Sequence, residues 1–93
     1  MARSILQNRK ECYFTKRTVN LHKHHIYEGE GRRERSEQFG LWVYLSEELH
    51  NGSEYGVHFD RERDQFLKRM GQAAFEKVHS REEFISLFGE SYL

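Results

Sequence analysis

The chain has no proline, only one cysteine among 93 residues, and no long apolar run. The single cysteine, Cys12, cannot form a disulfide within the chain, and no charged and apolar leader opens the sequence, so we expect a cytoplasmic protein. No apolar stretch approaches the roughly 20 residues of a membrane-spanning helix, which argues against a membrane partner. A chain of this length buries one modest core, and we expect a single domain over residues 1–93.

An overall excess of one charge sign is also absent, because 15 Lys and Arg balance 15 Asp and Glu. The two parts of the chain differ, however: residues 1–35 hold nine basic and four acidic side chains, and the rest hold six and eleven. Lys and Arg contacts to phosphate supply most of the sequence-independent affinity for nucleic acid. The basic part could bind nucleic acid or could simply be solvated, and charge alone leaves both interpretations open.

Short strands are predicted in the first half of the chain. Residues 1–10 have too few apolar side chains to define an element. Residues 12–14 and 19–27, separated by a polar turn at 15–18, are typical of a β-hairpin.

A further strand is predicted at residues 41–45, where apolar side chains alternate with Trp42 and Tyr44. These two aromatic rings could stack on bases, although covering the outer face of the strand is the simpler role. Before this strand, glycines indicate a loop, and residues 34–39 predict a helical turn that ends at Gly40.

The chain after residue 60 shows helical periodicity. Apolar side chains recur at spacings of three and four, which predicts a helix that Asp60 can cap and that places them in the core: Phe66, Leu67, Met70, Ala73, Ala74 and Val78. The capping box of Ser80 and Glu83 predicts a second helix, which Gly89 ends. With a short helix at 46–50, the pattern predicts an α+β protein.

Histidine stands out by its placement. Four of the six histidines flank two short segments rich in glycine: His24, His25, His50 and His58. Imidazole both ligates metals and moves protons near neutral pH. Because neighbours on a strand face opposite sides, His24 and His25 must take different roles. A lone histidine on a strand is more often a packing residue, and we interpret His22 and His79 in that way.

The order and spacing of short motifs over residues 12–59 carry a family resemblance: His24-His25-Ile26, Gly40-Leu41, Leu49-His50-Asn51 and Gly56-Val57-His58-Phe59. This arrangement resembles the HNH endonucleases, and within them small phage-encoded HNH-like proteins. The resemblance implies a ββα-metal core over residues 12–59, with a β-hairpin and a short helix. Two C-terminal helices over residues 60–93 would follow this core.

The resemblance also assigns roles to the histidines. It implies that His24 and His50 ligate a divalent metal ion and that His25 is the general base that deprotonates the attacking water. His58 is a further candidate ligand, and Glu54, four residues after His50, is its rival. The implied ion is Mg²⁺ or Mn²⁺ for activity, although Zn²⁺ or Ni²⁺ would bind an imidazole site more tightly.

Two departures from the family pattern bear on this site. Many relatives carry an Asn just before the apolar strand that orients the base; Gly40 stands there in this chain, so another group, such as a backbone carbonyl, must orient His25. Relatives with a structural zinc carry two Cys-x-x-Cys pairs, and we expect no such zinc here. The four corresponding positions are Cys12, Thr15, Ser46 and Leu49.

The resulting prediction is a metal-dependent endonuclease that hydrolyses DNA phosphodiesters. Candidate contacts to the DNA phosphates are the basic residues near the histidine pair: Lys23, Arg32, Arg33 and Arg35. The alternative is a degenerate HNH scaffold that serves a phage as a nucleic-acid-binding or regulatory module without catalysis. In that case its partner would be DNA or a phage or host protein.

Overall fold

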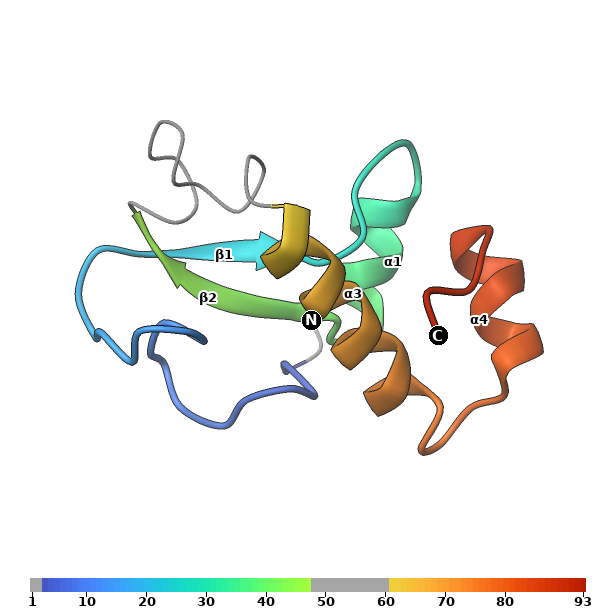
Figure 1. Ribbon diagram of the computed structural model, residues 1–93, viewed down its shortest axis with the longest axis horizontal. Coiled ribbons are helices and arrows are strands. Elements are labelled where there is room, and N and C mark those ends of the chain that lie inside the picture. The colour runs from blue at the N-terminus through green and yellow to red at the C-terminus, as the bar shows by residue number, and fades with distance from the viewer. Residues whose placement is uncertain (1–2, 48–60) are drawn as a thin grey trace.

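The computed structural model describes residues 3–47 and 61–93. In chain order, its elements are β1 (Leu21–His25), α1 (Arg32–Gln38), β2 (Trp42–Ser46), α3 (Arg61–Phe75) and α4 (Arg81–Phe88). The two strands form one antiparallel sheet, and these helices gather at the end of the sheet where β1 ends (Figure 1). The arrangement confirms the predicted α+β class.

Cross-strand pairing confirms the predicted alternation of faces. His24 lies opposite Val43, and His25 lies opposite Trp42. Directly opposed residues of an antiparallel pair share a face, so one face of the sheet carries His24 and the other carries His25. The apolar side chains of β2 on the His24 face, Val43 and Leu45, are completely buried, as is Leu41 just before the strand.

The predicted hairpin between residues 12–14 and 19–27 is wrong. β1 pairs with β2, which follows it after α1. Residues 12–14 belong to a turn, which is closed by the N–H of Lys16 donating to the carbonyl of Cys12 at 2.9 Å. Lys16 and Asn20 both have positive φ, which interrupts extended backbone before β1. Pairing with β2 also buries an apolar face of the strand, which lowers the free energy of the fold. The residue pattern around β1 does not show this gain, because it depends on residues that are distant in the sequence.

The N-terminal segment lies along the outer edge of β2. The Ser4 hydroxyl donates to the carbonyl of Trp42 at 2.6 Å, and the N–H of Tyr44 donates to the side-chain oxygen of Gln7 at 2.6 Å. The N–H of Tyr13 donates to the carbonyl of Tyr44 at 2.9 Å. These contacts satisfy backbone groups on an edge that would otherwise be open to pairing with another chain.

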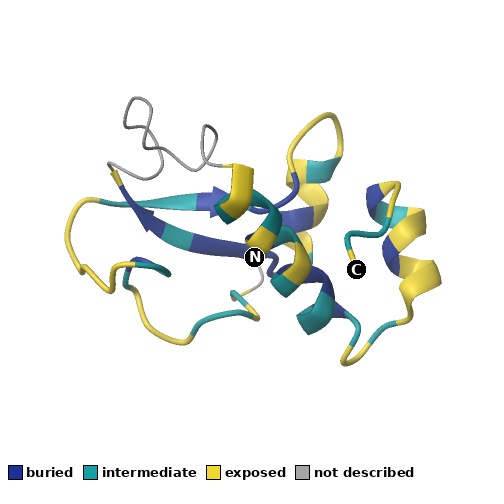
Figure 2. Ribbon diagram, viewed as in Figure 1, coloured by how far each residue is buried: buried dark blue, intermediate teal, exposed yellow. Residues whose placement is uncertain are grey.

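Tyr27 joins the sheet to α3 and α4. It is 1% exposed, its ring packs against those of Phe84 and Phe88 at centroid distances of 5.2 and 4.6 Å, and its hydroxyl donates to the carbonyl of Lys68 at 2.6 Å. A Cβ at Gly71 would lie 2.8 Å from that hydroxyl, so the missing side chain lets α3 approach. Figure 2 shows the buried residues in the sheet and on parts of the helices that face inward.

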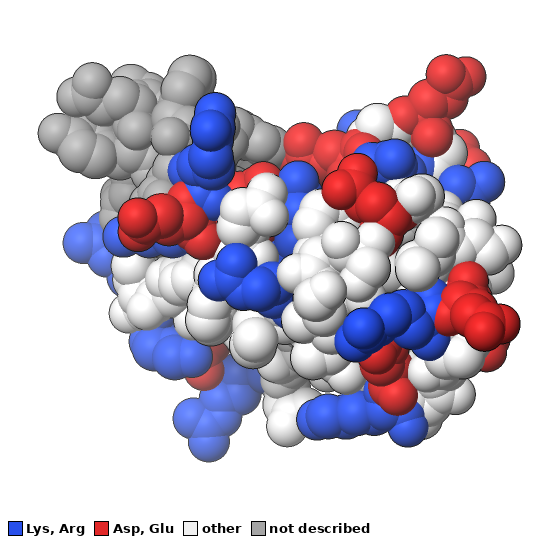
Figure 3. Space-filling view, turned by 45° about the vertical axis from the view of Figure 1, so that its right-hand side comes forward, with Lys and Arg blue, Asp and Glu red and all other residues white. Residues whose placement is uncertain are grey.

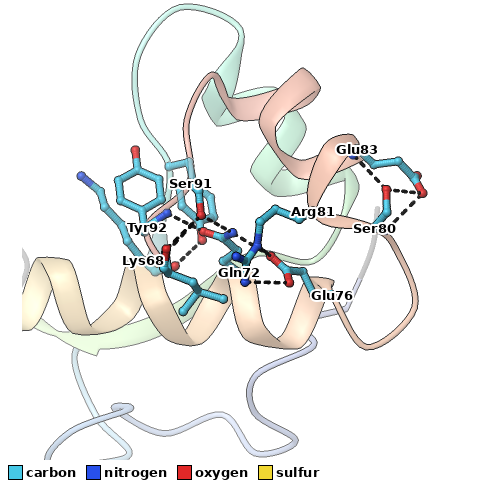
Figure 4. Close-up of polar contacts among 10 residues, drawn as sticks. Lys68, Gln72, Glu76, Ser80, Arg81, Glu83, Ser91 and Tyr92 are labelled. Carbon is cyan, nitrogen blue, oxygen red and sulfur yellow. Dashed lines mark hydrogen bonds and ion pairs between the residues drawn. The ribbon is translucent and has the colours of Figure 1, made fainter.

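A buried amide fastens the C-terminal segment to α3 (Figure 4). Gln72 is fully buried, and its side-chain oxygen accepts from the N–H of Tyr92 at 2.6 Å. Its amide nitrogen donates to Ser91 Oγ at 2.9 Å and to Glu76 Oε2 at 2.7 Å. The amide thus has the partners that a buried polar group requires.

The predicted ends of α4 are confirmed. Ser80 Oγ accepts from the N–H of Glu83 at 3.1 Å, and the Glu83 carboxylate accepts from the N–H of Ser80 at 3.3 Å. Gly89 ends the helix with a left-handed φ of +92°. The predicted short helix at 46–50 and the Asp60 cap reach into residues outside the described ranges.

The prediction that the six apolar side chains at helical spacing after residue 60 lie in the core is wrong for two of them. Leu67 and Phe75 are buried, but Phe66 is 38% exposed and Val78 is 79% exposed. Because α3 ends at Phe75, the helical periodicity that would have turned Val78 inward stops before it.

Candidate functional site

The candidate site forms where α1 packs against β1. Lys23 and His25 share one face of β1, and α1, which follows the left-handed Gly31 (φ +79°), presents Glu37 to both. His25 Nε2 lies 2.9 Å from Glu37 Oε1, and Lys23 Nζ lies 3.2 and 3.3 Å from the two carboxylate oxygens. One carboxylate therefore holds two side chains of the same strand face.

The charge of Glu37 decides which nitrogen of a neutral His25 ring carries the proton. A hydrogen bond from His25 lowers the pKa of Glu37, burial opposes this effect, and Lys23 adds to it. Glu37 is therefore ionised at neutral pH and acts only as an acceptor. We assign the proton of a neutral His25 ring to Nε2 from this hydrogen bond, which leaves the lone pair of a base on Nδ1.

Glu37 is a residue of the candidate site that the sequence analysis missed. A group such as a backbone carbonyl was expected to orient His25, and a carboxylate fills that role instead. Glu37 belongs to no recognised motif and lies 12 residues after His25. Its spacing of four from Arg33 indicates a shared helix face, but only the packing of α1 on β1 brings it to the histidine.

A shallow surface hollow of about 410 Å³ opens beside this pair, lined by His25, Arg33, Glu34 and Glu37. The His25 side chain is 13% exposed, and Arg33 is exposed. Two of the four basic residues predicted to contact phosphate, Lys23 and Arg33, therefore lie next to His25.

The other two, Arg32 and Arg35, lie toward α4. Arg35 Nη1 donates to the carbonyl of Leu87 at 2.7 Å, and a Cβ built on Gly89 would lie 2.8 Å from Arg32 Nη2. Cations near the C-terminus of a helix complement its dipole and its last carbonyls. These contacts give the two residues a structural role, and their contact with phosphate stays a prediction.

His24 is 1% exposed and lies on the face opposite to His25, so the two neighbouring rings are separated as predicted. Its Nδ1 lies 3.7 Å from Oε1 of Glu28, a distance too long for a hydrogen bond. An imidazole and a carboxylate at this separation are donor types that divalent transition metals accept.

The remaining predicted ligands, His50, His58 and the rival Glu54, lie outside the described residues. Within residues 3–47 and 61–93, no three His, Cys, Asp or Glu side chains are placed to hold a metal ion together. The convergence of His24 and His50 on one ion therefore stays a prediction.

Cys12 is buried in the hydrophobic core as predicted, but its sulfur also accepts hydrogen bonds. The N–H of Thr15 donates to Cys12 Sγ at 3.4 Å. Burial raises the pKa of the thiol, but hydrogen bonds from Thr15 and from the backbone of Ser46 and Phe14 outweigh it and lower the pKa to about 7. Residues 12, 15 and 46 therefore lie close together around this sulfur.

No protein-family model matches this chain, and no curated protein or solved structure matches it significantly. None of the helices in the described part of the chain combines the length and apolar character needed to cross a membrane.

Proposed function

We propose that this chain is a metal-dependent endonuclease of the HNH type that hydrolyses DNA phosphodiesters. The order of motifs around the histidine pair supports the family, and the pairing of His25 with Glu37 at 2.9 Å is the observation that supports the chemistry. A histidine oriented by an ionised carboxylate is a recurrent general base in hydrolytic enzymes. Under this proposal, residues 12–59 are the ββα-metal core.

His25 would take the proton of the attacking water on Nδ1. Glu37 keeps the ring in the required orientation through Nε2 and stabilises the positive charge that the ring gains with the proton. Lys23 helps to keep Glu37 ionised, so the orienting group stays an acceptor throughout. Arg33, at the rim of the same hollow, would contact a phosphate oxygen.

The divalent ion would supply stabilisation of the charge that develops on the phosphoryl and leaving oxygens. His24 would hold it together with His50 and either His58 or Glu54, and the Glu28 carboxylate lies 3.7 Å from the His24 ring. The mixed imidazole and carboxylate donors suit Mn²⁺, with Mg²⁺ as the alternative for turnover and Zn²⁺ or Ni²⁺ as tighter occupants.

The test is nicking of supercoiled plasmid DNA with Mg²⁺ or Mn²⁺. The wild-type protein should produce relaxed circles, and the product should be absent with chelator and with His25→Ala. His79→Ala is the matched control, because His79 stacks on Phe75 at 4.4 Å and pairs with Glu83 away from the site. If wild type and His25→Ala leave the plasmid equally intact with every metal, the nuclease proposal fails.

A second candidate is a binding module on the same scaffold without catalysis. It is favoured by the network that encloses His25, in which Glu37 and Lys23 occupy one side of a ring that is 13% exposed. This function predicts an intact plasmid together with a gel shift that weakens steeply with salt.

A further inference from the structure

A hollow of about 430 Å³ lies between the N-terminal segment and the outer side of β2. Three cations line it, Arg3, Arg9 and Lys10, together with Trp42 and Tyr44, and none of the described residues that line it is acidic. Its volume is within the range of small-molecule sites, roughly 300–1,000 Å³. Figure 3 shows Lys and Arg side chains at several places along the lower edge of this face of the molecule.

The two walls of this hollow, the N-terminal segment and β2, are joined by hydrogen bonds. The hydrogen bonds of Ser4 to Trp42 and of Tyr44 to Gln7 fasten the N-terminal segment to β2 at 2.6 Å each. The rings of Trp42 and Tyr44 meet edge to face, with centroids 5.1 Å apart. Lys10 Nζ lies 5.7 Å from the Tyr44 centroid, so cationic and aromatic groups form one surface.

The hollow and the candidate site lie on the same side of the sheet. Trp42 is paired with His25, and Tyr44 is paired with Lys23. Lys23 Nζ lies 4.2 Å from the centroid of Trp42 and also binds Glu37. A continuous path of basic and aromatic side chains therefore leads from the N-terminal segment to His25.

We propose that this hollow binds an unpaired nucleotide of a single-stranded nucleic acid, with a base on the Tyr44 ring and its phosphates near Arg9 and Lys10. Every base offers a face for stacking, but only unpaired bases expose it to an aromatic side chain. Cations around such a ring track the phosphate backbone. The inference deepens the proposed nuclease function, on which it rests, because it names an unwound or single strand beside His25 as the form of its substrate.

Trp42 is the only tryptophan of the chain and reports directly on the hollow. Titration with oligothymidylate in buffer with chelator should change its fluorescence. Arg9→Gln/Lys10→Gln should weaken binding and lower the slope of log affinity against log salt by about 1.4, since each lost phosphate contact on a single strand contributes about 0.7. The control Arg69→Gln/Lys77→Gln removes the same charge from exposed positions elsewhere and should retain the wild-type affinity.

A second pair of variants separates stacking from charge. Tyr44→Leu removes the ring and should weaken binding about 5- to 150-fold, the effect of losing one base–aromatic stack. Tyr44→Phe keeps the ring and should bind like wild type. Thermal unfolding of both variants shows whether a loss of affinity merely follows a loss of fold.

Three results would overturn the inference: unchanged Trp42 fluorescence on binding, wild-type affinity in Arg9→Gln/Lys10→Gln, or equal affinity for a duplex of the same length. The plasmid assay distinguishes this failure from failure of the nuclease proposal. If oligothymidylate binds at the hollow but the plasmid is not nicked, the hollow is a nucleotide-binding site and the nuclease proposal fails. If the plasmid is nicked and the rate does not change in variants of Arg9, Lys10 and Tyr44, the nuclease proposal stands and the inference about the hollow fails.

Discussion

The carbonyl oxygen of Arg3 occupies the space in which a side chain on Gly40 would begin. Gly40 has a left-handed φ of +70°, and its own carbonyl accepts the N–H of Ile5 at 2.9 Å. The N-terminal segment and the turn at Gly40, two residues before β2, are therefore packed backbone to backbone. This contact gives a physical reason for glycine at a position where the proposed HNH family carries an orienting Asn, and the His25 ring is paired with Glu37 instead.

Replacing Gly40 should release the N-terminal segment. In both Gly40→Asn and Gly40→Ala the new Cβ overlaps the Arg3 carbonyl, and Ala also fits a positive φ less well than Asn. We expect a loss of stability of about 1–3 kcal/mol, larger for Ala, and faster tryptic cleavage after Arg9 and Lys10. Gly29→Asn is the control for backbone strain alone, because Gly29 also has a positive φ (+110°) but the nearest atom to its Cβ is 3.9 Å away. A Gly40→Asn protein with wild-type stability and wild-type protection from trypsin would contradict the packing.

Removing the charge of Glu37 should slow the proposed nicking reaction. Glu37→Gln can still meet His25, but an amide can donate as well as accept, so the ring loses its fixed tautomer. We expect the nicking rate to fall at least about tenfold, the effect of losing an orienting partner of a functional histidine, with little change in the thermal midpoint. The exposed Glu82→Gln on α4 should nick at the wild-type rate. Equal rates for the two variants would mean that Glu37 does not position the base.

Cys12 should make stability depend on pH. Its pKa falls from 9.0 to about 7 on folding, so between these values the unfolded chain binds more protons than the folded one. The free energy of unfolding should therefore rise by about 2 to 3 kcal/mol between about pH 7 and about pH 9, for a shift of this size. This contribution of Cys12 should disappear as the pH is lowered from 9 to 7. Urea unfolding at several pH values tests this, with Cys12→Ala as the control that should lack the rise. A flat wild-type profile would show that the thiol titrates normally.

The buried amide of Gln72 should contribute more to the free energy of unfolding than the exposed amide of Gln38 on α1. Gln72→Leu keeps a similar volume but leaves the N–H of Tyr92 without its 2.6 Å acceptor. We expect a loss of about 1–3 kcal/mol in the free energy of unfolding, measured by urea denaturation. Gln38→Leu changes an exposed glutamine and should change stability little. Similar small effects for both would remove Gln72 as a structural anchor.

Features that depend on neighbours within about four residues were readable from the sequence. The capping box of Ser80 and Glu83, the αL glycine at the end of α4, and the alternation of His24 and His25 all follow from local backbone geometry. The helical turn before Gly40 was readable for the same reason. The roles given to His24, His25, His50 and His58 come from the family resemblance and remain predictions.

Features that depend on contacts between distant segments were decided by the tertiary structure. The partner of β1, the attachment of the N-terminal segment to β2 and the contact of Arg35 with Leu87 required residues 17 to 52 positions apart to meet. No spacing in the chain predicts that Glu37 would reach His25, because this depends on how α1 packs against the sheet. The sequence by itself determined where elements end and which way their side chains alternate, since those are short-range effects; which faces meet was decided by burial of apolar surface over the whole chain.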